Sequence, residues 1–222
     1  MTMPLHQPML AWTMRAARSP SLLWLVAVAM AGACVSMAGA CGGTGATQGA
    51  TCDAFAYPCG PYGFVQGSTI ADLVLPTQHD DNASGSAVDD PVVTVHLSDY
   101  REKASSLAIV IGSQTCAPCQ NEQSTLVDLS RRYTRAVFLE AIVQGQAGAQ
   151  ADQAVVDGWA TQFALPFDLT ADPSRALLPY YDPTAFPIGI VIQLADMQIV
   201  HIGSGQITAG DAFEASLTAA LP

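Results

Sequence analysis

The pattern of hydrophobic and polar positions divides the chain, from about residue 70 onward, into alternating strands and helices. Strands are predicted at 92–97, 107–111 and 137–143, and a strand or extended arm at 70–75. The run at 107–111 is apolar at every position, which is typical of a central strand buried on both faces. A helix is predicted at about 117–132, with Leu126 and Leu129 on one face.

The second half of the chain continues this alternation. A helix is predicted at about 151–163, a turn opens at 166–168, and a short helix fits 173–178. The runs at 188–194 and 198–202 predict a hairpin, and a last helix spans about 208–221, with Thr208 as its cap and Asp211 in its first turn. A loop dense in Asp, Asn, Ser and Gly covers 79–90. This order predicts an α/β fold with a mixed sheet and helices on both faces.

The first 40 residues have the layout of an export signal. Arg15 and Arg18 precede an apolar run at 22–33, and small residues end in Ala-Gly-Ala at 38–40. A positive stretch, a short apolar core and a small-x-small exit are typical of a cleaved signal peptide. A transmembrane anchor is the alternative, although the core is shorter than the ~20 residues that a spanning helix needs.

Cys41 follows this signal directly. Its surroundings, Ala-Gly-Ala before it and a Gly-rich stretch after it, resemble a bacterial lipoprotein box, which implies lipidation at Cys41 and a membrane anchor. Simple cleavage after Ala40 and use of Cys34 are the alternatives. Residues 41–61 are rich in Gly, Thr, Ala and Pro and are interpreted as a flexible tether, in which Cys52 and Cys59 form a structural disulfide that closes a small loop.

Composition and charge exclude several partners. The chain has 222 residues, half of them hydrophobic, and a formal net charge of −11. Arg15 and Arg18 are in the first 40 residues, which hold none of the 19 acids, so the remainder carries −13. Nucleic acid needs a basic surface, so no nucleic-acid partner is predicted. Electrostatic binding to anionic lipid is excluded for the same reason.

The run Cys-Ala-Pro-Cys at 116–119 lies where a predicted strand gives way to a predicted helix. Two cysteines three residues apart on a first helical turn can form a disulfide, and the unpaired N–H groups of the helix favour a thiolate at Cys116. A free thiol with a pKa of ~8.5 is only ~3% thiolate at pH 7, whereas one with a pKa of ~7 is about half thiolate. Cys116 is therefore the predicted nucleophile, and Cys119 resolves the mixed disulfide.

Two other interpretations of this pair remain. A zinc site needs two more ligands, and no second Cys-x-x-Cys is present, so neither a metal nor another cofactor is predicted. A purely structural disulfide between Cys116 and Cys119 is the second alternative. Pro118 fits the first helical turn, where its missing N–H has no cost.

The apolar strand, the dithiol and the following amphipathic helix resemble the thioredoxin superfamily, in particular exported TlpA-like and redoxin-type thiol–disulfide oxidoreductases. The resemblance covers about residues 62–222 and implies a thioredoxin-like three-layer sandwich. It also implies that Pro187, in Phe-Pro-Ile at 186–188, is the cis-proline beside the dithiol, and that Phe186 presents its backbone to a substrate strand. Pro183, followed by Thr184, is the rival position.

This sequence departs from the resembled family at the dithiol. Thr115 stands where that family usually has Trp, and Ala117 replaces the commoner Gly, so the choice of client is not implied. Together with Pro118 these residues are predicted to contact substrate. Glu140, the one acid inside the apolar run at 137–143, is a candidate proton relay to Cys119; a structural position at a strand edge is the alternative.

The leading hypothesis is a tethered enzyme of the periplasm or cell envelope. It acts on protein disulfides, as a reductant, and the resemblance implies a membrane thiol relay as its electron source. A non-catalytic thioredoxin-fold lipoprotein with a permanent 116–119 bridge is one alternative. A thiol peroxidase is the other, although Ile109 replaces the Pro of the peroxiredoxin pattern.

Overall fold

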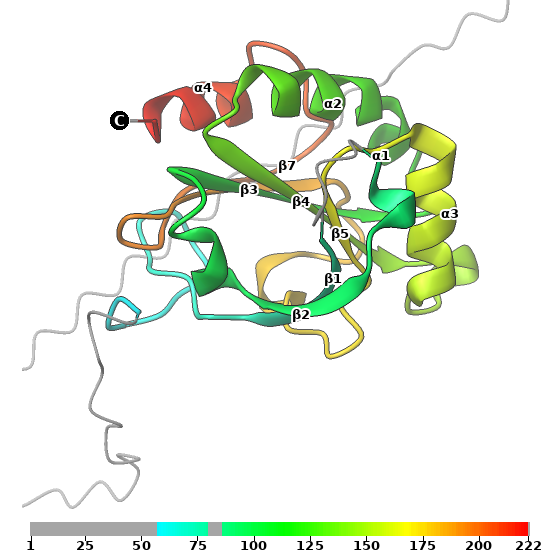
Figure 1. The fold of residues 1–222 in the computed structure, drawn as a ribbon, viewed down its shortest axis with the longest axis horizontal. Coiled ribbons are helices and arrows are strands. Elements are labelled where there is room, and N and C mark those ends of the chain that lie inside the picture. Colours follow the sequence, from blue (N-terminus) through cyan, green and yellow to red (C-terminus); the bar gives the residue numbers. More distant parts are fainter. Residues whose placement is uncertain (1–56, 80–85, 222) are drawn as a thin grey trace, which may run out of the picture. The chain divides into compact units, whose positions relative to one another are not determined.

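The computed structural model describes residues 57–79 and 86–221. Seven strands form one mixed sheet in the order β2-β1-β5-β4-β3-β6-β7 (Figure 1). The strands are β1 (Val74–Gln78), β2 (Val92–His96), β3 (Ser106–Ser113), β4 (Ala136–Gln144), β5 (Asp168–Thr170), β6 (Ile188–Gln193) and β7 (Gln198–Ser204). The α-helices are α1 (Ala117–Asn121), α2 (Gln123–Arg132), α3 (Gln153–Phe163) and α4 (Ala212–Ala219).

The centre of the sheet is parallel and its margins are antiparallel. Strand β4 pairs in parallel with β3 and with β5, whereas β6 and β7 continue the sheet from β3 as an antiparallel hairpin. On the other side, β1 pairs antiparallel with β5 and with β2. All eight residues of β3 are buried, as its unbroken apolar pattern requires. The carboxyl end of this central strand leads directly into the cysteines.

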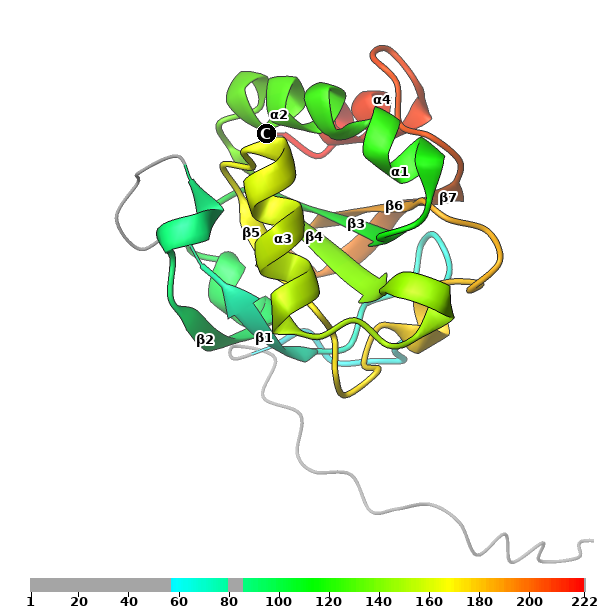
Figure 2. The ribbon, with the colours of Figure 1, turned by 90° about the vertical axis from the view of Figure 1, so that its right-hand side faces the viewer.

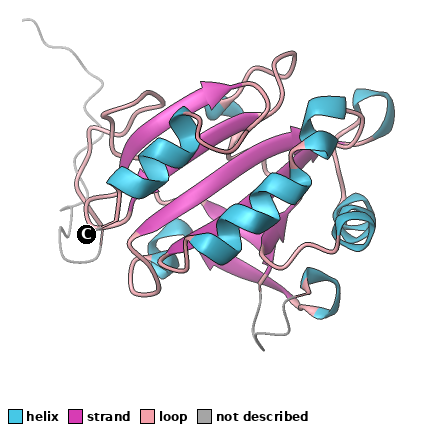
Figure 3. Ribbon diagram, turned by 90° about the horizontal axis from the view of Figure 1, so that it is seen from above, coloured by secondary structure: helices cyan, strands magenta, loops and turns pink. Residues whose placement is uncertain are grey.

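The two faces of the sheet are covered differently. Helices α2, α3 and α4 pack on one face, where Leu126, Trp159 and Phe213 are buried against alternate sheet residues. Figure 2 shows α3 lying across β4 and β5, and Figure 3 shows helices lying along the strands. The second face carries the 3₁₀ helices η2 (Leu97–Tyr100) and η4 (Leu178–Tyr180) and the segment around Ile70.

The predicted α/β class and the mixed sheet are confirmed, and several boundaries shift. The first strand begins at Val74 rather than at residue 70, and the expected turn at 166–168 leads into strand β5. The helix predicted at 117–132 is interrupted for one residue, at Glu122, between α1 and α2. The last helix starts at Ala212, because the Asp211 carboxylate, and not Thr208, caps it by accepting from the Glu214 N–H.

Several predictions lie outside the described residues. They are the export signal at 1–40, lipidation at Cys41, and the Cys52 half of the predicted structural disulfide. Cys59 is disulfide-bonded, and its pairing with Cys52 stays a prediction. Within residues 57–79 and 86–221, no helix has both the length and the apolar character needed to span a bilayer.

Candidate redox site

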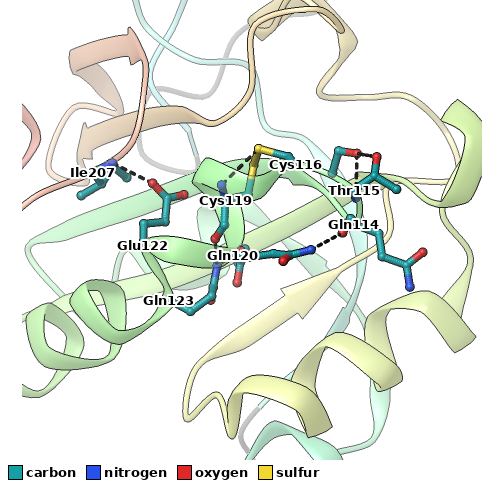
Figure 4. Close-up of a disulfide and its surroundings, with 10 residues drawn as sticks. Gln114, Thr115, Cys116, Cys119, Gln120, Glu122, Gln123 and Ile207 are labelled. Carbon is teal, nitrogen blue, oxygen red and sulfur yellow. Dashed lines mark hydrogen bonds between the residues drawn. A yellow bond between two sulfur atoms is a disulfide. The ribbon is translucent and has the colours of Figure 1, made fainter. Parts of the chain in front are cut away.

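Cys116 and Cys119 form a disulfide at the junction of β3 and α1, with Cα atoms 5.2 Å apart (Figure 4). Cys119 is completely buried, whereas Cys116 is partly exposed and the intervening Ala117 and Pro118 are exposed. Only the sulfur of Cys116 can therefore meet a macromolecular partner directly. The asymmetry arises because Cys116 caps the helix from outside, while Cys119 lies one turn in, facing the sheet.

The helix start stabilises negative charge on the Cys116 sulfur. Cys116 is the N-cap of α1, and its Sγ accepts a hydrogen bond from the Cys119 N–H at 3.1 Å. The loop before it is fixed by the Cys116 N–H, which donates to the Ser113 carbonyl, and by the Gln120 amide, which donates to the Gln114 carbonyl at 2.9 Å. A donor aimed at sulfur favours the thiolate once the disulfide is reduced.

Glu122 is a fully buried acid one helical turn beyond Cys119 (Figure 4). Its Oε2 accepts from the Ile207 N–H at 2.7 Å, and its Oε1 has no hydrogen-bond partner among the described residues. Burial, reinforced by the charges of Glu140 and Asp211, raises the pKa of Glu122 to about 8, against the effect of the Ile207 hydrogen bond. Glu122 is therefore mostly protonated at neutral pH, and can give up or take up a proton near the dithiol.

Glu140 is the second buried acid of the site and lies on β4, on the face that carries the helices. Gln123 connects it to the dithiol: the Gln123 amide donates to Glu140 Oε1 at 2.7 Å and to the Cys119 carbonyl at 2.8 Å. Burial raises the pKa of Glu140 to about 7, although Gln123 and the indole of Trp159 oppose the rise. Within the described part of the chain, the Trp159 Nε1–H group has no acceptor in hydrogen-bond geometry.

A shallow depression of about 320 Å³ opens beside the exposed cysteine. Thr115, Cys116 and Pro118 line one side, and Phe186 and Pro183 line the other. The peptide bond between Phe186 and Pro187 is cis; the other cis bond of the described residues joins Gly60 to Pro61, so the bond that joins Asp182 to the rival Pro183 is trans. The sequence-predicted residues Thr115, Cys116, Pro118 and Phe186 thus meet in one place. Ala117 is exposed on the same helical turn but does not line the depression.

Sequence reasoning missed Glu122. Its neighbours in the chain, Gln120, Asn121 and Gln123, are all polar, so the segment has the pattern of a solvated helix face. The only available signal was its position three residues after Cys119, which places both side chains on one face of a helix. No group of three or more His, Cys, Asp or Glu side chains in the described ranges has the arrangement of a metal site.

No protein-family model and no curated protein sequence matches the chain. Solved structures do: a protein assigned as the thiol:disulfide interchange protein DsbE of Chlorobium tepidum has a TM-score of 0.52 and 18% identity over 72% of this chain and all of that one. A secreted thiol-disulfide isomerase of Corynebacterium glutamicum has a TM-score of 0.53 and 16% identity over 69% of this chain and 85% of its own.

The exposed lipoprotein thioredoxin Etrx1 of Streptococcus pneumoniae is a third similar structure, with a TM-score of 0.52 and 20% identity over 67% of this chain and 99% of that one. At these identities the likeness establishes the fold, and it agrees with the predicted resemblance. The mixed sheet, the dithiol at the carboxyl end of its central strand and these structural neighbours together assign the chain to the thioredoxin-like fold.

Proposed function

We propose that the chain is an exported thiol–disulfide oxidoreductase that acts on protein disulfides through Cys116 and Cys119. The observation that carries this proposal is the asymmetry of the pair: one sulfur is accessible and receives a hydrogen bond at a helix start, and the other is buried behind it. A bridge with a purely structural role needs neither accessibility nor a donor at one sulfur. The thioredoxin-like fold supports the same conclusion by analogy.

The reaction is a two-step exchange. In the reductive direction, the Cys116 thiolate attacks one sulfur of a substrate disulfide; a Cys116–substrate bond forms and the substrate disulfide breaks, releasing a thiolate that takes up a proton. Cys119 then loses its proton and attacks the Cys116 sulfur, which releases the second substrate thiol. The substrate disulfide gains two electrons and two protons, and the protein ends as the 116–119 disulfide.

The second step requires a group that accepts the proton of the buried Cys119 thiol. Glu122 and Glu140 are the acids around it, and their raised pKa values of about 8 and about 7 match proton exchange near neutral pH. Gln123 donates both to the Glu140 carboxylate and to the Cys119 backbone carbonyl, and so positions Glu140 close to the dithiol. Glu122 follows Cys119 by three residues, which places both side chains on the same side of the helix. We assign the two acids jointly to this proton transfer.

The proposed setting is the periplasm or cell envelope, with the mature chain tethered through a lipid on Cys41. The signal-like first 40 residues and the Gly-rich tether support this setting. A reductant in an oxidising compartment has to be re-reduced after each turnover, and a membrane thiol relay is the proposed source of electrons. The anchor and the direction of electron flow are both parts of this proposal.

A redox titration tests the proposal. The full-length chain is equilibrated in dithiothreitol buffers of graded potential, and the fraction of 116–119 disulfide is measured by alkylation and mass spectrometry. A potential more oxidising than about −300 mV is expected, because structural disulfides fall below that value. A far more reducing potential would instead support the non-catalytic lipoprotein with a permanent bridge.

A further inference from the structure

The depression at Cys116 continues into a second one. Gln144 and Pro183 line both the depression beside the dithiol and an adjoining one of about 170 Å³. The second is built at the carboxyl ends of β4 and β5, and Tyr181 and Arg175 belong to its lining. The two adjoining depressions, together called the groove here, extend from the reactive sulfur along the 171–186 segment, which is where an extended substrate chain attached to Cys116 has room to lie.

An aromatic pair joins the linings of the two depressions, because Tyr181 lines one and Phe186 lines the other. The rings of Tyr181 and Phe186 lie 5.5 Å apart and are tilted by 37°. Both side chains are half-buried, so each keeps a surface open to a ligand. On the cysteine side, Thr115 supplies no aromatic surface, so the aromatic contact area beside the dithiol comes from the 181–186 segment.

Arg175 supplies the exposed charge of the groove. The charged lining residues of the two depressions are Asp172 and Arg175, and Asp172 is buried. Within the described ranges, no hydrogen bond or ion pair engages the Arg175 guanidinium. The Arg175 charge also acts on the aromatic pair. Burial and the charge of Asp172 raise the pKa of the Tyr181 hydroxyl, and the positive charge of Arg175 opposes that rise.

The turn that carries Arg175 is held rigidly. Arg175 has a φ of +58° and Asp172 a φ of +48°, both in the left-handed region that residues other than glycine rarely adopt. The buried Asp172 carboxylate accepts from the N–H groups of Ala176 at 2.8 Å and Leu177 at 2.9 Å. The Gln150 amide donates to the Asp172 carbonyl from outside the turn. These bonds keep Arg175 in an otherwise unfavourable conformation at the groove.

We propose that this groove selects protein disulfides that have acidic residues next to the reacting cysteine, with Arg175 binding a substrate carboxylate and Tyr181 and Phe186 packing against the adjacent side chain. The inference rests on the proposed exchange at Cys116 and adds the class of substrate. The guanidinium is a bidentate donor for carboxylates, and Arg175 is the exposed charge among the residues that line the two depressions, which makes charge the selective feature.

Model peptides with one intramolecular disulfide test the inference. Three versions carry three Glu, three Gln or three Lys residues on both sides of the disulfide ring, so the result does not depend on register. The rate constant for oxidation of the reduced full-length chain is measured at pH 7 in low and high salt. Arg175→Gln is compared with Arg131→Gln, which removes the same charge from an exposed position on α2.

Arg175→Gln is expected to lower the ratio of Glu-peptide to Lys-peptide rates about fivefold in low salt, an effect that shrinks in high salt. Arg131→Gln is expected to change the ratio less than twofold, and Arg175→Lys to keep it near the wild-type value. Equal changes in both Gln variants would overturn the inference while leaving the exchange function intact. If none of the peptides oxidises the reduced protein, the proposed function fails, and this inference fails with it.

Discussion

Replacing Glu122 by Gln is predicted to stabilise the protein at neutral and alkaline pH. Glu122 is fully buried, and its pKa rises from 4.5 to about 8 on folding. Below pH 4.5 the acid is protonated in both the folded and the unfolded protein, so it has no pH-dependent cost there. Above pH 4.5 only the unfolded state ionises freely, so folding stability is lost progressively until the folded group also ionises near pH 8.

The size of the effect follows from the two pKa values. Each pH unit between them costs about 1.4 kcal/mol, so Glu122 lowers the free energy of unfolding by about 3 kcal/mol at pH 7 and by about 5 kcal/mol at pH 9. A glutamine side chain resembles the protonated acid in shape, and its amide oxygen retains the acceptor for the Ile207 N–H. The variant therefore avoids the ionisation cost without losing the hydrogen bond.

The assay is denaturant unfolding of the oxidised protein between pH 5 and pH 9. The stability curve of Glu122→Gln is expected to lie close to wild type at pH 5 and to rise above it as pH increases. Glu102→Gln makes the same chemical change at an exposed glutamate and is expected to follow the wild-type curve. Parallel curves for wild type and Glu122→Gln from pH 5 to pH 9 would refute the assignment of a raised pKa to Glu122.

Two further substitutions test the packing around the site. Gln123→Ala removes the donor to Glu140 Oε1 and is expected to lower the free energy of unfolding, measured with denaturant, by about 2 kcal/mol. The substitution also raises the pKa of Glu140 further, so the loss of stability is expected to be larger at pH 8 than at pH 5. A loss that is independent of pH would contradict this expectation. Gly189→Ala places a Cβ atom 2.7 Å from the Phe213 ring and is expected to lower the free energy of unfolding by about 1–3 kcal/mol, which is measured as a lower Tm. An unchanged Tm would show that α4, which carries Phe213, moves away without cost.

Much of the fold could be predicted from the sequence because its central elements have unambiguous patterns. The apolar run of β3, the run of β4 that only Glu140 interrupts, and the hairpin of β6 and β7 have lengths and compositions typical of strands. Strand β5 has three residues, Asp168–Thr170, which is too short for any alternation to appear, and it is defined by its pairing with β1 and β4. The start of α4 depended on whether Thr208 or Asp211 is the N-cap, and both residues fit the local pattern of a cap.

The site divides in the same way. The dithiol and its strand-to-helix setting follow from spacing alone, since cysteines three apart meet on one helical turn. Glu140 stood out as a lone acid in an apolar run, whereas Glu122 did not, because its burial comes from the loop that contributes Ile207, 85 residues later in the chain. Arg175 was likewise hidden, because its role depends on a turn shaped by Asp172 and on the groove that tertiary packing forms. Long-range contacts of this kind leave no local signal.

Trapping the mixed disulfide is the most direct test of thiol–disulfide exchange at Cys116. Reduced Cys119→Ser is mixed with the Gln-flanked disulfide peptide, and the adduct on the proteolytic fragment that carries residues 116–119 is measured by mass spectrometry with and without dithiothreitol. Cys116→Ser, which keeps only the buried thiol of this pair, is the matched control. Cys119→Ser is expected to gain one peptide through Cys116, which dithiothreitol releases, and Cys116→Ser is expected to gain none on Cys119. An adduct on Cys116→Ser of equal yield, or no adduct on Cys119→Ser, would contradict the assignment of Cys116 as the attacking thiolate and Cys119 as its resolving partner.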